Sequence, residues 1–518
     1  MRILGVNAIG HHDASACLVE DGVLTALVEE ERFTRVKHAV RQQPVHAVRW
    51  CLEARGLNWQ DIDVLATPWV EEEHGIVAPP GYREDISFGV RDLGRDTDRW
   101  PDGLVVLLTE TGGNTGRAPV LMQVSHHLAH AASAYWRSGM TEATVLVVDG
   151  DGDRISTTVA HGHDGEIKAL RQFSTVDSLG QFYASMTDYL GFGFFGEGKL
   201  MGLAPYGTAA IEFPEIVLDG DGGYHIDLPG DLRRFDPAGS EWQRRIDVWE
   251  RVLSGRFGPK RTRRDKPVPS RLDEWPQIDL DLAASTQRAL EEALVHVVRG
   301  AIAATGCNDL VIAGGVGLNC AANGAIANLP DVGAFFVQPV AGDNGVPMGA
   351  ALHASVASGA FPMATMRSAF LGPSFGDDDY VTALRDAGLP FLASSDVAQE
   401  AARRLTDGEV VCWFQGAMEA GPRALGHRSI LASPTSAATR DRVNDVKRRS
   451  RWRPLSPSVN VESRTAFASG RISPFMIVAD RVSPGWRERM PGVTHVDDSA
   501  RPQTVDRDVD PVYWRLID

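Results

Sequence analysis

The chain has 518 residues, of which 43% are hydrophobic and 23% are charged, and this composition is that of a globular protein with more than one domain. Its formal net charge of -16 argues against a broad basic face for nucleic acid, so we expect no nucleic-acid partner.

The chain begins directly with a strand-like run, "MRILGVN", and no stretch of about 18 apolar residues follows. Its five cysteines are scattered and show no CxxC spacing. We therefore expect a reduced, cytoplasmic protein that is neither secreted nor embedded in a membrane.

Two segments, 2–28 and 144–173, share one pattern of strand, Asp/Gly-rich turn, strand, Asp-Gly turn and strand. Two such meanders, each followed by helical segments, predict a duplicated α/β lobe with a cleft between the copies. This plan is similar to that of the actin, sugar kinase and heat-shock chaperone (ASKHA) superfamily, whose members bind nucleotide in the cleft. At this point the similarity is one of fold.

Farther along, the apolar spacing predicts a helix over 282–304. The run "DLVIAGGVGLNC" at 309–320 predicts a strand, a glycine turn and a helix, which present backbone N–H groups to phosphate. Segment 209–281 is irregular, and its basic run "RFGPKRTRRDK" is typical of a solvated loop. Segment 362–388 is loop-like and predicts a boundary, after which a second domain begins at 389.

The stretch "QVSHHLAH" places His126 and His130 one helical turn apart, whereas His127 points elsewhere. Such a pair binds one metal ion, or serves as core or capping residues. Asp149 ends a predicted strand, and Asp343 lies in the turn "AGDNG". The alternative for each is an ordinary turn residue without a role in metal binding. Together the four residues form a mixed nitrogen and oxygen set that suits Fe(II), Mn(II) or Zn(II).

Ordered motifs carry a more specific resemblance. They include "HDASACLVEDG", "EERFTRVKHA", "HHLAHAASAYW", "VLVVDGDGD", "GEGKLMGLAPYG", "IAGGVGLNC" and "AGDNG", followed by "FQGAMEAGPRALGHRSILASP" and "VNDVKRRSRWRPLSPSV". In this order they resemble the NodU/CmcH family of O-carbamoyltransferases over about residues 1–510. The resemblance implies a duplicated ASKHA domain over 1–361, with lobes at about 1–140 and 141–361, a linker at 362–388 and a YrdC-like α/β domain over 389–518. The family pattern continues beyond "HVDDSARPQTV", so we expect this second domain to be C-terminally short.

The resemblance also implies residue roles. His126, His130, Asp149 and Asp343 match the family's metal ligands, generally for iron, Fe(II) or another divalent ion. His12 and Lys37 match residues that line the transfer site, where His12 orients the acceptor or takes its proton. The alternative for His12 is a turn residue without contact to the acceptor. The segments "GEGK" and "GGVGLN" resemble nucleotide-holding loops, and the residues concerned are Glu197, Gly198, Lys199, Gly315, Val316 and Asn319.

The second domain carries a basic segment at 440–453, whose density stands out in an acidic chain. A solvated helix face explains Arg440, Arg442 and Arg448. The residues that fall on the family's phosphate-binding motifs are Arg423, Lys447, Arg449, Arg453 and Arg501. Arginine suits bidentate phosphate binding, and lysine suits a point contact.

The implied reaction has two steps. Carbamoyl phosphate and Mg-ATP form carbamoyl-adenylate in the second domain, and the carbamoyl group then moves to a hydroxyl of a small natural product in the first. Loops at 68–120, with Trp69, the acidic run 71–73 and Trp100, are expected to line the acceptor's entrance. The alternatives are a tRNA threonylcarbamoyl transferase and a nucleotide-gated scaffold. A homodimer is compatible with the resemblance.

Overall fold

The computed structural model describes residues 1–8, 12–70, 82–84, 88–229, 241–261, 268–360 and 364–518. It divides into two compact units. The first comprises Met1–Pro269 and Glu274–Met366, and the second comprises Ser270–Asp273 and Arg367–Asp518. In the described part of the chain, no helix is long and apolar enough to cross a membrane. All five cysteines are free thiols.

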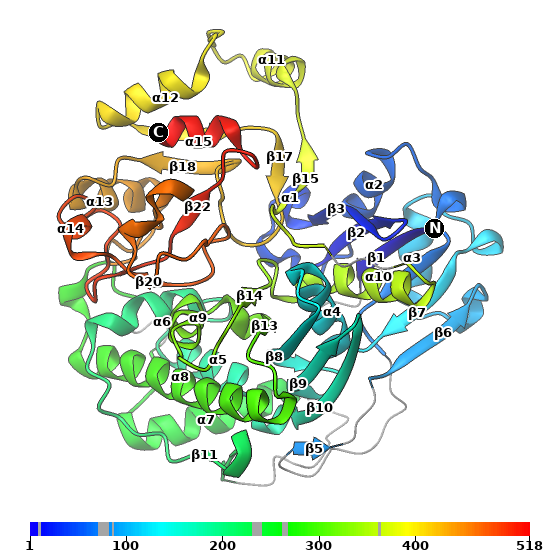
Figure 1. Cartoon of the computed structure of the whole chain (residues 1–518), viewed down its shortest axis with the longest axis horizontal. Coiled ribbons are helices and arrows are strands. Elements are labelled where there is room, and N and C mark those ends of the chain that lie inside the picture. Colours follow the sequence, from blue (N-terminus) through cyan, green and yellow to red (C-terminus); the bar gives the residue numbers. More distant parts are fainter. Residues whose placement is uncertain (9–11, 71–81, 85–87, 230–240, 262–267, 361–363) are drawn as a thin grey trace. The chain divides into compact units, whose positions relative to one another are not determined.

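The first unit contains two six-stranded sheets (Figure 1). The first sheet has the order β3-β2-β1-β4-β7-β6. Its strands are β1 (Arg2–Asn7), β2 (Ser15–Glu20), β3 (Val23–Glu29), β4 (Val64–Thr67), β6 (Val90–Gly94) and β7 (Val120–Val124). The first three strands form an antiparallel meander, whereas β4 and β7 run parallel to β1.

The second sheet repeats this arrangement in the order β14-β13-β8-β9-β10-β5. Its strands are β5 (Tyr82–Glu84), β8 (Glu142–Gly152), β9 (Ile155–His163), β10 (Glu166–Ser174), β13 (Leu310–Ala313) and β14 (Phe335–Val337). Strands β8, β9 and β10 form the meander, and β13 and β14 run parallel to β8. The same order of a meander followed by two parallel strands confirms the predicted duplicated ASKHA plan.

Local turn chemistry explains why both meanders form. The turns between β2 and β3 and between β9 and β10 are Asp21-Gly22 and Asp164-Gly165. Both residues of each turn have positive φ, 49° and 84° in the first and 49° and 83° in the second. These are the left-handed conformations that a tight two-residue hairpin requires and that Asp-Gly supplies.

The first unit also contains helices. They are α1 (Glu31–Thr34), α2 (Val45–Glu53), α3 (Asp102–Glu110), α4 (His126–Ser138), α5 (Leu179–Tyr189), α6 (Glu197–Leu203), α7 (Glu241–Phe257), α8 (Gln277–Thr305), α9 (Cys320–Ala327) and α10 (Val346–Ala357). Helix α8 confirms the helix predicted over 282–304, and Gly306 ends it in a left-handed conformation. A short hairpin, β11 (Ile216–Leu218) with β12 (Tyr224–Ile226), completes this unit.

Part of the segment that we predicted to be irregular is helical. Helix α7 lies within 209–281. The basic run begins in the last turn of α7, and two of its described residues are ion-paired: Lys260 Nζ lies 2.6 Å from a carboxylate oxygen of Asp188, and Arg261 pairs with Asp279. The sequence of a basic run does not show which carboxylates elsewhere in the chain pair with it. Residues 262–266 of the run lie outside the described part.

The second unit mixes helices with two-stranded sheets. Its strands are β15 (Phe370–Ser374), β16 (Val410–Phe414), β17 (Ala417–Glu419), β18 (Arg428–Ala432), β19 (Ser458–Asn460), β20 (Asp480–Arg481), β21 (Ser499–Ala500) and β22 (Gln503–Val505). Its helices are α11 (Asp377–Asp386), α12 (Val397–Thr406), α13 (Ala437–Val446), α14 (Pro484–Arg487) and α15 (Pro511–Ile517). The 362–388 segment is more than a linker, because β15 pairs with β17 and α11 follows it. The local sequence of 362–388, which resembles a loop, does not predict that part of it pairs with a strand about 45 residues later.

A close backbone approach in the first unit yields a stability prediction. A Cβ atom on Gly349 of α10 would lie 1.7 Å from the carbonyl oxygen of Ala129 in α4. Gly349→Ala should therefore lower the free energy of unfolding by about 3 kcal/mol, since neither backbone can yield freely. Gly255→Ala in α7, where a Cβ meets nothing within 4 Å, is the matched control and should be neutral or slightly stabilising. Equal urea midpoints for both variants would contradict this prediction.

Candidate functional site

Two imidazoles and two carboxylates converge inside the first unit. Helix α4 begins at His126, directly after β7, and brings His130 one turn later to the same side. Asp149 lies where the ladder between β8 and β9 is interrupted, and Asp343 begins the turn before α10. The Nε2 atom of His126 lies 3.2 Å from Asp149 Oδ2 and 3.4 Å from Asp343 Oδ1, and that of His130 lies 3.6 Å from each.

This arrangement fits a divalent cation. One donor atom from each of the four buried residues lies within 4.8 Å of the other three. The two Nε2 atoms lie only 3.0 Å apart, a spacing that suits two ligands at about 2.0–2.2 Å from one ion. Gly152 makes room for the cluster, because a Cβ there would lie 2.1 Å from His126 Cδ2. The mixed donor set, without thiolate, suits iron, manganese or zinc.

The electrostatics keep the carboxylates in the form that binds metal. Burial raises the pKa of Asp149, but hydrogen bonds with His126 and His130 outweigh it and hold that pKa well below its usual range. For Asp343, burial and the charge of Asp149 raise the pKa, but the charge of His126 and hydrogen bonds with both histidines outweigh them and hold that pKa below its usual range. Both carboxylates are therefore ionised at neutral pH.

His127 has a different part in the structure. Its Nδ1 lies 2.9 Å from Thr158 Oγ1 and its Nε2 lies 3.0 Å from the Ile155 carbonyl oxygen. Burial, with the neighbouring charge of His126, lowers the pKa of His127 to about 3. His127 is thus a neutral imidazole that ties α4 to β9.

His12 stands beside this cluster. Its Nδ1 lies 3.0 Å from Asp13 Oδ2 and 4.0 Å from Asp343 Oδ2. Burial lowers the pKa of His12, but the hydrogen bond with Asp13 and the charge of Asp343 outweigh it and raise that pKa to about 9. Lys37 is exposed and begins a short 3-10 turn, Lys37–Ala39.

Sequence reasoning missed Asp13 and His38. The Nδ1 atom of His38 lies 2.9 Å from Asp13 Oδ1, so the Asp13 carboxylate is shared by two imidazoles. Both residues stand inside the motifs "HDASACLVEDG" and "EERFTRVKHA", next to His12 and Lys37. The motifs indicated that these segments are functional, but only the fold shows that Asp13 contacts both His12 and His38.

The residues expected at the acceptor's entrance have different surroundings. Trp69 donates its Nε1–H to Asn7 Oδ1 over 2.9 Å, and its ring centroid lies 4.2 Å from that of His126. Trp100 is only 5% exposed and packs in the core of the first lobe, so its predicted place at the entrance is wrong. Residues 71–73 lie outside the described part.

The glycine turn after β13 is joined to the buried cluster. The Gly315 N–H donates to Asp149 Oδ1 over 2.9 Å. Gly314 has a φ of 90°, and a Cβ there would lie 2.2 Å from the Val148 carbonyl oxygen, so the turn requires glycine. Val316 lies in the same short turn, Gly315–Leu318.

The other expected nucleotide-binding residues lie on α6 and α9, which touch through Met201 and Cys320, whose sulfur atoms are 3.7 Å apart. Asn319 caps α9 and exchanges two hydrogen bonds with Gln287, so its amide is engaged within the protein. Glu197 and Gly198 begin α6, and burial raises the pKa of Glu197. Lys199 Nζ lies 3.4 Å from the Phe192 carbonyl oxygen.

In the second unit, four of the five predicted phosphate-binding residues form one cationic group. Burial lowers the pKa of Lys447, and the charges of Arg449, Arg453 and Arg501 lower it further. Arg423 is not among those charges. Its turn is instead held by Glu419, whose Oε1 accepts N–H groups of Leu425, His427 and Arg428 at 2.8, 2.9 and 3.0 Å.

Other arginines of the basic segment contact acceptors of the chain itself. Arg451 is exposed and pairs with Asp445 at 2.7 Å, and Arg440 pairs with Asp441 at 3.0 Å. The Arg442 guanidinium donates to the Gly408 carbonyl oxygen. Mutual repulsion is therefore concentrated at Lys447, Arg449 and Arg453, where a bound anion would relieve it.

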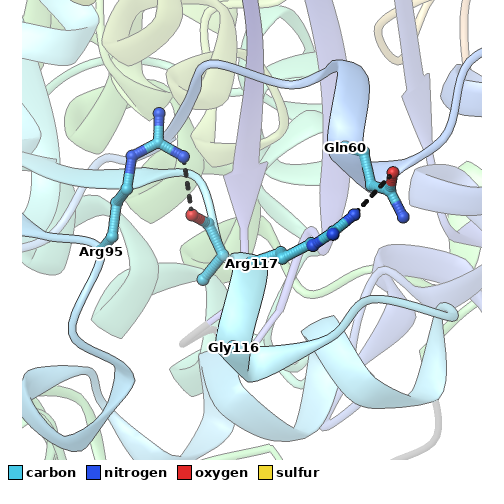
Figure 2. A pocket seen from close by; sticks show the side chains of 5 residues that line it. Gln60, Arg95, Gly116 and Arg117 are labelled. Carbon is cyan, nitrogen blue, oxygen red and sulfur yellow. Dashed lines mark hydrogen bonds between the residues drawn. The ribbon is translucent and has the colours of Figure 1, made fainter.

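A surface hollow of about 440 Å³ lies elsewhere in the first lobe and contains none of these residues (Figure 2). Its lining includes Arg95 and Arg117. Arg95 donates to the Ala118 carbonyl oxygen over 3.1 Å, and Arg117 donates to Gln60 Oε1 over 3.5 Å. The chain's own acceptors thus already contact both guanidinium groups.

Fold and sites together define a two-unit protein with a buried histidine and aspartate centre in one unit and a group of neighbouring cations in the other. Residues 2–352 match the family model "Carbamoyltransferase N-terminus", and residues 402–518 match "Carbamoyltransferase C-terminus". The chain belongs to the carbamoyltransferase family.

Relatives match this chain over nearly its whole length. The nodulation protein NolNO of Sinorhizobium fredii is 37% identical over 521 residues, which cover 98% of this chain and 71% of that protein. An uncharacterized protein of Synechocystis is 32% identical, and the match covers 100% of this chain and 88% of the relative. Among solved structures, full-length HypF in its phosphate- and nucleotide-bound form is 11% identical with a TM-score of 0.38, covering 70% of this chain and 56% of HypF.

The buried cluster makes a prediction about metal content. His130→Gln should lose most of the divalent metal that the purified wild-type protein carries or takes up, because it removes one of four donors. His127→Gln is the matched control, since His127 is adjacent and buried but directed at Thr158 and Ile155. Elemental analysis after dialysis measures both variants. Equal metal content in the two would exclude His130 as a ligand.

The cationic group makes a prediction about anions. Arg453→Ala should weaken ATP binding by roughly ten- to a hundredfold, as expected for losing about 1.5–3 kcal/mol from a charged hydrogen bond. Arg451→Ala is the control, because Arg451 is already paired with Asp445 and should leave the Kd unchanged. Isothermal titration calorimetry compares them. A similar loss in both would show that only net charge matters.

The lowered pKa of Lys447 adds a pH dependence. Its ammonium form is lost at a lower pH than that of an ordinary lysine, so anion binding should weaken as the pH rises through that range. Lys447→Arg should remove this part of the pH dependence, because guanidinium keeps its proton. The measurement is the Kd for ATP of the wild type and of Lys447→Arg between about pH 7 and pH 10, roughly the range in which a lysine titrates. Parallel curves for the two proteins would contradict it.

Proposed function

We propose that the chain is an ATP-dependent O-carbamoyltransferase, which makes carbamoyl-adenylate and transfers its carbamoyl group to a hydroxyl of a small natural product. The observation that carries this proposal is the convergence of His126, His130, Asp149 and Asp343 next to the Gly315 turn, in a member of the carbamoyltransferase family. The five free thiols fit the cytoplasmic location that we also propose.

The activation step is assigned to the second unit. Water releases phosphate from carbamoyl phosphate, and the resulting carbamate attacks the α-phosphorus of ATP, so that a new P–O bond forms and pyrophosphate leaves. Both cosubstrates are anions, and their charges require a counter-charge that water alone supplies poorly. Lys447, Arg449, Arg453 and Arg501 provide it. We assign Arg423, on the turn that Glu419 holds, to the same anions.

The transfer step is assigned to the first unit. The acceptor oxygen attacks the carbonyl carbon of carbamoyl-adenylate, and the bond from that carbon to the phosphate oxygen breaks, releasing AMP. Asp13 engages His12 Nδ1, so Nε2 is the nitrogen left to take the proton of the acceptor hydroxyl. Lys37 offers a charge for the leaving AMP, and the Gly315 turn with "GEGK" holds the nucleotide.

His126, His130, Asp149 and Asp343 would hold the divalent ion, Fe(II) or a similar metal. When bound, such an ion supplies Lewis-acid charge beside the transferred group. It would also offset the carboxylate charge that raises the His12 pKa, which favours the neutral imidazole that a base requires.

The proposal is tested by incubating the metal-loaded protein with ATP, carbamoyl phosphate and a panel of sugars, chitooligosaccharides, aminoglycosides, macrolides and β-lactams. The expected products are pyrophosphate, AMP and an acceptor heavier by one carbamoyl group, detected by mass spectrometry. His130→Gln should still release pyrophosphate but lose transfer, whereas Arg453→Ala should lose both. Omission of carbamoyl phosphate is the control. If pyrophosphate forms at the same rate without carbamoyl phosphate, the proposed activation chemistry is wrong.

A further inference from the structure

Three residues with left-handed backbone meet beside His12. Asp13, His38 and Phe195 have φ angles of 56°, 61° and 61°. They come from three separate segments, and for a side chain as bulky as phenylalanine this conformation is a genuine outlier. Backbone strain of this kind persists only where the surrounding contacts hold it, and it gathers at functional sites.

Asp13 is the centre of these contacts. Its N–H donates to the His38 carbonyl oxygen over 2.6 Å. Its carboxylate lies between two imidazoles, with Oδ1 2.9 Å from His38 Nδ1 and Oδ2 3.0 Å from His12 Nδ1. The Asp13 side chain therefore joins His12, which lies 4.0 Å from Asp343, to His38, which has no such contact with the metal cluster.

His38 is held from two further directions. The ring of Phe195 stacks on it with centroids 4.0 Å apart and an interplanar angle of 17°, and meets His12 edge-on at 5.2 Å. The His38 N–H donates to Glu31 Oε2 over 2.7 Å. Ring and backbone of His38 are thus fixed, although Phe195 itself is 38% exposed.

We propose that His38 is a positioning residue for His12. Its Nδ1–H donates to Asp13, which fixes the carboxylate so that the second oxygen accepts the Nδ1–H of His12. This selects the tautomer and ring orientation of His12 in which Nε2 is free to take a proton, the same logic by which a carboxylate orients a catalytic histidine elsewhere. Phe195 clamps the His38 ring in that position. The inference rests on the proposed role of His12 in transfer.

The test compares two substitutions that differ in where they place a donor. The side-chain amide of asparagine takes the position of a histidine Nδ1, and that of glutamine reaches toward Nε2. His38→Asn should therefore keep the kcat of transfer within about threefold, whereas His38→Gln and His38→Ala should lower it roughly ten- to a hundredfold with little change in KM. Kanamycin and chitotetraose serve as acceptor probes, and pyrophosphate release should remain unchanged in all three variants.

His46→Ala is the matched control. His46 also pairs its Nδ1 with a buried carboxylate, that of Glu30, but lies outside these contacts, so transfer should not change. Equal losses in His38→Asn and His38→Gln would overturn the proposal, because a purely structural role does not distinguish the two amides.

A second measurement does not depend on the acceptor. In protein labelled with ¹⁵N-histidine and kept above a pH of about 9, where His12 is a neutral imidazole, His12 should show a protonated Nδ1 in the wild type and in His38→Asn, and a mixture of tautomers in His38→Gln. His12→Gln identifies the signal. An unchanged His12 tautomer in His38→Gln would overturn the positioning role even if the chain transfers no carbamoyl group. Failure of transfer in the wild type with the expected tautomer change would instead count against the proposed function alone.

Discussion

The burial of two carboxylates against two imidazoles is the constraint on which the first unit depends. Asp149 and Asp343 repel each other, and neither is exposed enough for water to screen that repulsion. His126 and His130 offset it, and a divalent cation would offset it further. The four residues come from different elements: His126 and His130 from the N-terminal part of α4, Asp149 from the interrupted part of β8 and Asp343 from the turn before α10. These elements must therefore be held accurately for the charges to balance.

The surrounding contacts extend this constraint outward. Asp149 also accepts the Gly315 N–H, which ties the glycine turn after β13 to the cluster. Asn7 donates to the carbonyl oxygens of Asp13 and Asp343, and so connects the end of β1 with the second lobe. The groups assigned to transfer are therefore mechanically joined to the metal-binding set, whereas the cationic group of the second unit depends on its own turns and ion pairs.

The second unit illustrates how local context decides the use of a charge. Arg451 and Lys447 lie close together in one basic segment. Arg451 has Asp445 as a partner, and Lys447 is surrounded by other cations. Both residues are cations, and only the path of the chain after α13 places Arg451 beside a carboxylate and Lys447 beside other cations.

Much of the first unit could be predicted from short stretches of sequence. The Asp-Gly turns and the spacing of His126 and His130 act over a few residues, because turn conformation and helical periodicity are local properties. The tertiary structure alone decided that Asp13 bridges His12 and His38, that Trp100 belongs to the core, and that 370–374 forms a strand with 417–419. These contacts join segments far apart in the chain, and their geometry depends on strand order and packing, which no short stretch of sequence contains.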